Sequence, residues 1–331
     1  MILSPEQWMS NIFSIESHAK FEVLALDAFQ FQYQHIAVYR DYCKTLKINP
    51  TEVKTITQIP FLPVEFFKTH RVIADNLSVE TIFTSSGTTG METSKHLVHN
   101  ISVYENSFLK GFNHFYGSPS DYCILALLPS YLEREGSSLV YMANRLIQES
   151  GHPNSGFYLN NLSELATTLK QLSGTNQKTI LLGVTYALLD LAEQFPMHIP
   201  KTLIMETGGM KGRRKELIRE ELHYQLCQSF GVTHIHSEYG MTELLSQGYS
   251  KGEGIFQTPP WMKIYIRDTY DPFSYLIAER SGGINVIDLA NIYSCCFIET
   301  KDLGKTHTDG TFSVLGRFDN SDIRGCNLMV G

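Results

Sequence analysis

The chain of 331 residues carries 27 Lys and Arg residues against 34 Asp and Glu residues, a formal net charge of −7 at pH 7. No cluster of basic residues stands out, which argues against a nucleic acid or an anionic membrane as partner, because either needs a basic footprint. The start of the chain has no signal-peptide pattern, and no window approaches the roughly 18 apolar residues of a membrane span. The six cysteines show no Cys-x-x-Cys pair and no zinc spacing, so we expect a cytoplasmic protein with reduced thiols.

The first part of the chain is expected to be helical. Residues 4–7, Ser-Pro-Glu-Gln, form a capping-box pattern with proline at the first helical position. Apolar residues then recur at helical spacing, which predicts one or two helices over residues 5–46. A proline-containing loop segment follows.

The middle of the chain alternates apolar runs with helical patterns. Strands are predicted at 122–128, 178–184, 201–209 and 232–240, and the segments between them have helical character. Such repetition indicates a parallel sheet covered on both faces. After about Pro260 the pattern changes to short strands (KIYIRD, YLIAER, GGINVIDLA, CCFIETKD and TFSVLGRF) separated by turn residues, which predicts antiparallel β-structure.

The predicted fold class is therefore α/β, with mostly parallel sheets flanked by helices and a C-terminal antiparallel β portion. We expect a helical N-terminal region over residues 1–80 packed on the main domain, an α/β core over 81–258, and a β-rich subdomain over 259–331.

The segment TIFTSSGTTGMETSKH, residues 81–96, carries the first functional signal. A strand runs into six residues that are all Ser, Thr or Gly, and the backbone N–H groups of such a loop can converge on an anion. The Walker A and dinucleotide-binding glycine patterns are both absent. Taken alone, this stretch fits an exposed linker turn as well as it fits a phosphate-binding loop.

Three further motifs follow in order. The segments ETGGM (206–210), YGMTE (239–243) and TKDLGKTHTDGTFSVLGRFDN (300–320), together with SSGTTG, resemble the signatures of the adenylating superfamily of acyl-CoA synthetases, non-ribosomal adenylation domains and firefly luciferase. The resemblance extends over residues 84–326. Its length, its SSG-type loop and a cysteine near the C-terminus make the chain most similar to the acyl-protein synthetase family, which includes a subunit of the bacterial luminescence fatty acid reductase.

This resemblance implies roles for individual residues. The loop would hold the β- and γ-phosphates of ATP, Glu243 would hold Mg²⁺, and Thr242 would donate to the α-phosphate. Tyr239 would stack on the adenine, Asp302 would accept from the ribose hydroxyls, and Arg317 would reach the ribose or a phosphate. Lys95 departs from the family's spacing and Lys301 replaces a glycine, so their surroundings differ from the pattern. The implied catalytic residues are Thr242, Glu243, Cys326 and Lys95, and the implied nucleotide-binding residues are Ser85, Ser86, Gly87, Thr88, Thr89, Gly90, Gly208, Gly209, Tyr239, Gly240, Met241, Asp302 and Arg317.

The implied activity is ATP- and Mg²⁺-dependent conversion of a carboxylic acid, expected to be a fatty acid, into acyl-AMP, followed by transfer of the acyl group to a protein thiol. Cys326 is the candidate thiol, and the small lid domain of related enzymes is absent from this sequence. Two alternatives stay open: a ligase that uses coenzyme A or an acyl carrier protein as acceptor, and a non-catalytic nucleotide-binding scaffold. A reductase, an acyltransferase or an acyl carrier protein would be the partner. The sequence does not identify the acid.

The remaining candidate residues have simpler interpretations. His234 and His236 alternate on a predicted strand but lack a third ligand, which favours packed or hydrogen-bonded histidines over a zinc site. His96 and His99 are expected on the surface, and the cysteines within strands are expected to be buried. The acyl pocket is expected near residues 127–138 and 182–191.

Overall fold

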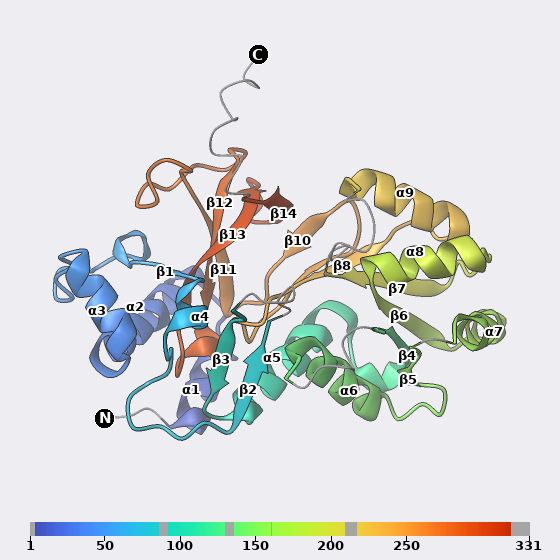
Figure 1. The fold of residues 1–331 in the computed structure, drawn as a ribbon, viewed down its shortest axis with the longest axis horizontal. Coiled ribbons are helices and arrows are strands. Elements are labelled where there is room, and N and C mark those ends of the chain that lie inside the picture. The colour runs from blue at the N-terminus through green and yellow to red at the C-terminus, as the bar shows by residue number, and fades with distance from the viewer. Residues whose placement is uncertain (1–3, 86–91, 130–135, 160, 209–216, 319–331) are drawn as a thin grey trace, which may run out of the picture. The chain divides into compact units, whose positions relative to one another are not determined.

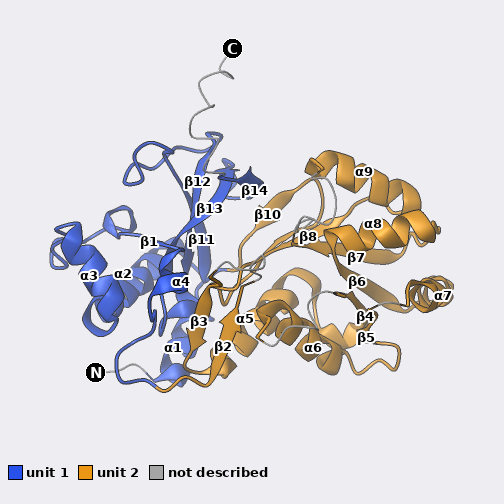
Figure 2. Ribbon diagram, viewed as in Figure 1, with its two compact units in different colours: residues 1–77, 260–331 blue, residues 78–259 orange. Residues whose placement is uncertain are grey.

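The computed structural model describes residues 4–85, 92–129, 136–159, 161–208 and 217–318, and it divides the chain into two compact units. Unit 1 comprises residues 1–77 and 260–331, and unit 2 comprises residues 78–259 (Figure 2). Among the described residues, no helix combines the length and the apolar character needed to cross a lipid bilayer.

Unit 1 combines N-terminal helices with the antiparallel C-terminal strands (Figure 1). Strands β11, β12, β13 and β14 pair antiparallel in that order, and the short β1 pairs with β13 in parallel. The elements of unit 1 are α1 (Pro5–Ile12), α2 (His18–His35), α3 (Ala37–Thr45), the 3₁₀ turn η1 (Ile56–Gln58), β1 (Leu62–Pro63), α4 (Phe66–Thr69), β11 (Met262–Arg267), β12 (Gly282–Asp288), the 3₁₀ turn η3 (Leu289–Asn291), β13 (Phe297–Thr306) and β14 (Phe312–Arg317).

One or two helices are predicted over residues 5–46, and three helices form there. The Ser4 hydroxyl accepts a hydrogen bond from the backbone N–H of Gln7 at 3.2 Å, so the first helix begins at the predicted cap. Ser17 caps a new helix in the same way, and the extended backbone of Ile36 separates the second helix from the third. The strand predicted at YLIAER is wrong: Tyr275 makes only an isolated bridge to Arg267, and the chain then turns.

A buried glutamine fastens α2 to the β-rich part of unit 1. The Gln32 side chain is fully buried; its amide nitrogen donates to the carbonyl oxygens of Asn291 (3.1 Å) and Ile292 (2.9 Å), and its oxygen accepts from the N–H of Cys296 (3.0 Å). A buried amide that makes all these bonds costs little, whereas the loss of one partner would leave polar groups unsatisfied.

Unit 2 contains the parallel sheet predicted from the alternating pattern. Its strand order is β10-β9-β8-β7-β6-β4-β5. Strands β8, β7, β6, β4 and β5 are parallel, β9 is antiparallel to β8, and β10 is antiparallel to β9. A separate hairpin joins β2 and β3. The elements of unit 2 are β2 (Thr81–Thr84), β3 (Lys95–Val98), α5 (Ile101–Tyr116), the 3₁₀ turn η2 (Pro119–Asp121), β4 (Tyr122–Leu127), α6 (Ser138–Ser150), β5 (Gly156–Phe157), α7 (Leu162–Ser173), β6 (Lys178–Val184), α8 (Thr185–Gln194), β7 (Thr202–Thr207), α9 (Arg219–Phe230), β8 (His236–Tyr239), β9 (Gly248–Ser250) and β10 (Ile255–Gln257).

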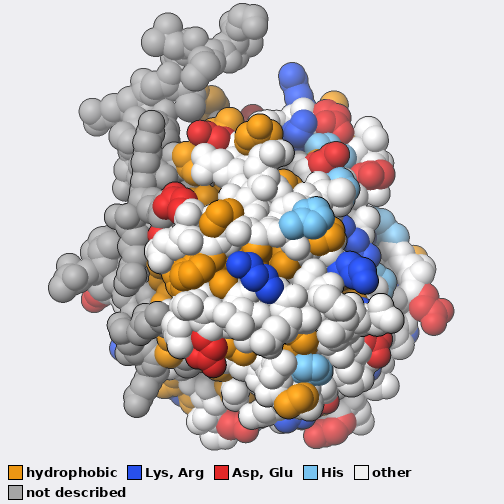
Figure 3. Space-filling model, turned by 90° about the vertical axis from the view of Figure 1, so that its right-hand side faces the viewer, with side chains coloured by type: hydrophobic (Ala, Val, Ile, Leu, Met, Phe, Trp, Pro, Cys, Tyr) orange, Lys and Arg blue, Asp and Glu red, His pale blue; other side chains and the backbone are white. Residues whose placement is uncertain are grey.

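Helices cover both faces of this sheet. Helices α5 and α6 lie on one face and α8 and α9 on the other (Figure 1). The central strands β4 and β6 are buried along almost their whole length, as expected for a parallel sheet covered twice. Acidic, basic and uncharged side chains are interspersed over the face of the molecule drawn in Figure 3. The α/β fold class predicted from the sequence is confirmed.

Candidate active site

The β2–β3 hairpin presents the Ser/Gly/Thr loop. Thr84 pairs with Lys95 at its open end, and the Ser85 N–H donates to the Ser94 carbonyl oxygen at 3.1 Å. The Ser85 hydroxyl in turn accepts from the Ser94 N–H at 2.9 Å, so this predicted phosphate ligand closes the neck of the loop. Lys95 is exposed. The other predicted loop residues lie outside the described part of the chain: Ser86, Gly87, Thr88, Thr89 and Gly90.

The next residue of the hairpin corrects one prediction. His96 was expected on the surface, but its side chain is fully buried and its Nδ1 lies 2.8 Å from the carbonyl oxygen of Thr242. His99, from the end of the same hairpin, contacts the Ser78 carbonyl at 2.8 Å in an exposed position. Sequence reasoning missed the His96 contact because the two residues are 146 positions apart. His96 therefore links the hairpin to the YGMTE motif.

The YGMTE motif follows β8 and turns sharply. The Leu244 N–H donates to the Met241 carbonyl at 3.1 Å, and Glu243 lies within this turn with only 5% of its surface exposed. A carboxylate oxygen is a ligand that Mg²⁺ favours, so Glu243 fits the predicted metal role by the chemistry of its donor atoms. Just beyond the turn, the buried Ser246 hydroxyl lies 2.9 Å from that of Ser107 on α5.

Two further predicted motifs meet at the carboxyl ends of β7 and β8. The parallel register places Thr207 opposite Glu238, so Gly208 and Tyr239 follow at the same edge of the sheet. In open α/β sheets this edge is the usual location of ligand sites. Gly208 has a φ of +68°, which favours glycine, and its carbonyl accepts from the Thr185 hydroxyl at 2.6 Å. Gly209 lies outside the described residues.

Tyr239 packs against other aromatic and cationic groups. Its ring centroid lies 6.2 Å from that of Phe256 at an interplanar angle of 69°, and the Arg219 guanidinium lies 5.0 Å from the Phe256 ring. Only 9% of Tyr239 is exposed. The adenine stacking predicted for Tyr239 stays a prediction.

Two buried carboxyl groups at this edge were missed by sequence reasoning. Glu206 faces α9, and its Oε1 lies 3.0 Å from Arg219 Nη1 and 3.8 Å from His223 Nε2. Burial works to raise the pKa of Glu206, but His223 and Arg219 outweigh it and hold the pKa below its usual value. The 3.8 Å separation is too long for a hydrogen bond, so Arg219 is the direct partner.

Glu238 has the opposite electrostatic environment. It is 9% exposed, and the Thr207 hydroxyl donates to its Oε2. Burial raises the pKa of Glu238 to about 7, the Thr207 bond lowers it, and the charge of Glu206 raises it further. Glu238 lies one residue before the YGMTE motif, yet its burial is a property of the fold that sequence spacing does not reveal.

In unit 1, the two predicted site residues of the 300–320 segment form an ion pair. Asp302 lies opposite Arg317 in the β13–β14 ladder, and Arg317 Nε is 3.4 Å from Asp302 Oδ1. The Arg317 side chain is 74% exposed, whereas that of Asp302 is 15% exposed. Lys301, the departure from the family pattern, forms an ion pair with Glu65. The ribose and phosphate contacts predicted for Asp302 and Arg317 stay predictions.

Comparisons with known proteins agree with these motifs. Residues 10–126 match the family model described as acyl-protein synthetase, LuxE. A long-chain-fatty-acid–luciferin-component ligase of Vibrio harveyi is 24% identical over 99% of this chain and 90% of the relative. A ligase of the same name from Photorhabdus luminescens is 39% identical, over 21% of this chain and 60% of the relative. The chain is similar to acyl-protein synthetases.

Solved structures show the same fold. The crystal structure of a 2-hydroxyisobutyryl-CoA ligase matches with a TM-score of 0.66 and 11% identity, over 91% of this chain and 70% of that one. ATP-bound MatB from Rhodopseudomonas palustris matches with a TM-score of 0.55 and 18% identity, over 72% of this chain. The match covers 48% of the MatB chain, about half of its length. These two matches show that the chain shares the fold of these ligases.

The cysteines divide into buried ones and the predicted acceptor. Cys123, Cys295 and Cys296 are fully buried, as predicted, and burial raises the pKa of each thiol. Cys43 is also buried, with its pKa raised to about 12, whereas Cys227 is half-buried. Cys326 lies outside the described residues, so its acceptor role stays a prediction.

The two histidines of the β8 region lie in different environments. His236 is in β8, and its Nδ1 lies 3.3 Å from the Tyr116 hydroxyl; burial lowers the pKa of His236 to about 4. His234 precedes the strand and is exposed. In the described ranges, no three His, Cys, Asp or Glu side chains are grouped so that they could hold a metal ion.

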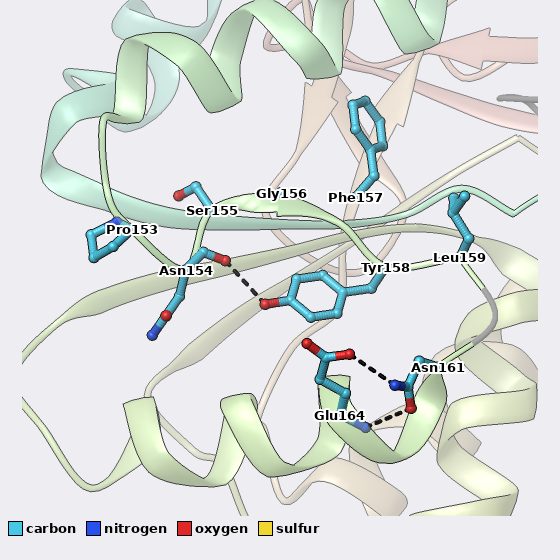
Figure 4. A pocket seen from close by; sticks show the side chains of 9 residues that line it. All are labelled: Pro153, Asn154, Ser155, Gly156, Phe157, Tyr158, Leu159, Asn161 and Glu164. Carbon is cyan, nitrogen blue, oxygen red and sulfur yellow. Dashed lines mark hydrogen bonds between the residues drawn. The ribbon is translucent and has the colours of Figure 1, made fainter.

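A surface hollow of about 580 Å³ lies beside β5 (Figure 4). Its polar contacts are local: the Tyr158 hydroxyl donates to the Asn154 carbonyl at 3.2 Å, and Asn161 caps α7 through Glu164. β5 is at the end of the sheet, three strands from β7, and none of the predicted site residues lines this hollow. We therefore assign it no part in the chemistry. The expected acyl-pocket segment 127–138 is described only in part, because residues 130–135 lie outside the described ranges.

Proposed function

We propose that this chain activates a carboxylic acid with ATP and Mg²⁺ and then transfers the acyl group to a protein thiol. The observation that carries the proposal is the similarity to a long-chain-fatty-acid–luciferin-component ligase over 99% of the chain. Support comes from the structure, in which the hairpin, the ends of β7 and β8, and the YGMTE turn belong to one compact unit.

In the first step, a carboxylate oxygen of the acid attacks the α-phosphorus of ATP, and the bond to the bridging oxygen of the β-phosphate breaks. Acyl-AMP forms and pyrophosphate leaves. Mg²⁺, when bound, would neutralise phosphate charge in this step. Glu243 would hold the ion, and Thr242 would donate to the α-phosphate, where charge builds up. His96 would keep their turn beside the phosphate loop through its contact with the Thr242 carbonyl.

In the second step, a thiolate attacks the acyl carbon, a thioester forms and AMP leaves. Cys326 is our candidate for this thiol, from its sequence context IRGCNLM. The neighbouring Arg324 would favour the thiolate. A reductase, an acyltransferase or an acyl carrier protein would receive the acyl group next.

Hydroxylamine trapping tests the first step. Incubation with ATP, Mg²⁺, hydroxylamine and a panel of carboxylic acids should give an acyl hydroxamate, and Glu243→Gln should abolish it. Glu221→Gln, an exposed carboxyl on α9, is the matched control and should leave the yield unchanged. If no acid gives a hydroxamate although ATP binds, adenylation is wrong and the scaffold alternative takes its place.

Labelled acid tests the second step. The protein should acquire a thioester that hydroxylamine removes, and Cys326→Ser should lose this label while it still forms hydroxamate. Cys227→Ser, at the half-buried cysteine, should retain the label. A label that persists in Cys326→Ser, or turnover that requires coenzyme A, would contradict the assignment of the acceptor.

A further inference from the structure

Two buried carboxyl groups end neighbouring strands of unit 2, and among the described residues only Glu206 has a cationic partner. Glu206 at the end of β7 pairs with Arg219 at 3.0 Å. Glu238 at the end of β8 has the Thr207 hydroxyl on its Oε2, and within the described ranges no Lys, Arg or His forms an ion pair with it. Burying a carboxyl without a cation is costly, and replacement by an apolar residue of similar volume is often neutral or stabilising. The fold itself therefore gives no reason for an acid at position 238.

The direction of the Glu238 side chain follows from strand alternation. Side chains one residue apart on a strand point to opposite faces of the sheet. Ser237 contacts Arg219 of α9 at 3.2 Å, whereas His236 contacts Tyr116 of α5 at 3.3 Å. Glu238 shares the face of His236 and points toward α5, while Tyr239 points to the other face. If Tyr239 contacts the adenine, Glu238 faces away from the base.

One of the two segments expected to line the acyl pocket, 127–138, lies on the face that carries Glu238, whereas the other, 182–191, runs into α8 on the opposite face. The segment 127–138 leads into α6, and α6 packs against α5 on this face. The Tyr141 ring of α6 lies 6.0 Å from that of Tyr104 on α5, and the Tyr104 ring lies 5.3 Å from that of Phe83 in the hairpin. Glu238 adds a hydrogen-bonding group to a layer otherwise rich in aromatic side chains.

One oxygen of the carboxyl is left for a ligand. Oε2 accepts from Thr207, and Oε1 lies under Gly240, where an added Cβ would collide with it. Gly240 is itself exposed, so the absence of a side chain there leaves Oε1 close to the protein surface at the ligand-binding edge of the sheet.

We propose that the acid activated by this enzyme carries a hydroxyl or amino group in addition to its carboxylate, and that Oε1 of Glu238 accepts a hydrogen bond from that group. This inference rests on the proposed function and refines its substrate class from an unsubstituted fatty acid to a hydroxy or amino acid. A site built to bind such a group discriminates strongly against analogues that lack it, because the buried acceptor is then left without a partner.

Matched acid pairs test the inference. Each pair has one chain length and differs only by a hydroxyl or amino group, placed next to the carboxylate or at the far end, and the series covers short, medium and long chains. The ratio of kcat/KM for hydroxamate formation within a pair does not depend on the fraction of folded enzyme. We expect at least one pair to favour the substituted acid by about tenfold or more.

Variants separate the role of Glu238 from a general effect of buried charge. Methionine has a volume similar to that of glutamate but no hydrogen-bond acceptor of comparable strength. Glu238→Met should therefore bring the ratio of kcat/KM within a pair of acids to about one or below, while the KM for ATP stays unchanged. Glu206→Gln, the control on the other face, should keep the ratio of the wild type even if less protein folds. Equal or better use of every unsubstituted acid, or a ratio that Glu238→Met leaves unchanged, would overturn the inference. Hydroxamate from no acid at all would instead overturn the proposed function, and the inference with it.

Discussion

Glu238→Gln should stabilise unit 2 at alkaline pH and have little effect under acidic conditions. The pKa of this carboxyl is raised from 4.5 to about 7 in the folded protein, chiefly by burial. A raised carboxyl pKa means that the folded state holds the proton more tightly than the unfolded state. The folded state therefore loses stability as the pH rises from 4.5 through 7, and it regains that stability below 4.5.

The size of the effect follows from the shift. A difference of about 2.5 units between folded and unfolded states corresponds to about 3 kcal/mol of stability lost once the group is fully ionised. Glutamine cannot ionise and retains an acceptor for Thr207, so the variant escapes this loss. For a unit of 150–250 residues, 3 kcal/mol shifts the melting temperature by about 6–12 °C.

The neighbouring groups do not cancel this dependence. His236 has a pKa of about 4 and is neutral between pH 5 and 8, and the tyrosines on the same face, Tyr116 and Tyr249, have pKa values raised by burial. The Lys251 ammonium lies 5.7 Å from the Tyr116 ring. Glu206, with its lowered pKa, is ionised over the same range.

Thermal unfolding of both proteins at pH 5 and pH 8 measures the effect. The difference in melting temperature between Glu238→Gln and the wild type should widen as the pH rises. Glu206→Gln is the control: it leaves Arg219 without this partner and removes an acid whose pKa is lowered below 4.5, so it should destabilise about equally at pH 5 and pH 8. Parallel pH profiles for Glu238→Gln and the wild type would refute the reasoning.

Three further changes test other contacts. His96→Ala should raise the KM for Mg·ATP about tenfold, because it removes the buried hydrogen bond to the Thr242 carbonyl. His99→Ala is the control. Equal KM values for the two variants would count against a role of the His96–Thr242 contact in ATP binding. Gly240→Ala should lower the free energy of unfolding by about 1–3 kcal/mol in chemical denaturation, because the new Cβ meets Glu238. Adding Glu238→Ala to the same chain should remove this destabilisation. If the effects of the two substitutions on stability are additive, the two side chains do not collide. Gln32→Met should cost about 3 kcal/mol because it removes the bonds to the Asn291 and Ile292 carbonyls and the acceptor of the Cys296 N–H. Unchanged denaturation would show that these bonds contribute nothing.

Local patterns predicted the elements of this fold well where apolar runs were long. Strand β6 (Lys178–Val184) coincides with the predicted strand, and helix α6 (Ser138–Ser150) lies in a segment predicted to be helical, because a doubly covered strand and an amphipathic helix each leave a clear pattern of apolar residues. The strand predicted at 275–280 did not form, because Ile277 is 78% exposed and Glu279 adopts a φ of +68° in a turn. A short apolar run does not by itself show whether a partner strand is available.

The sequence by itself determined the order of the motifs and hence the resemblance to adenylating enzymes, since residue type and spacing are local properties of the chain. Only the tertiary structure decided the environment of each side chain. It buried His96 against a carbonyl 146 positions away, and it placed Arg219 beside Glu206 and the Thr207 hydroxyl beside Glu238, although both acids adjoin recognised motifs. Burial, ion pairing and pKa depend on groups that distant segments bring together, so they become visible only when the strands are placed side by side.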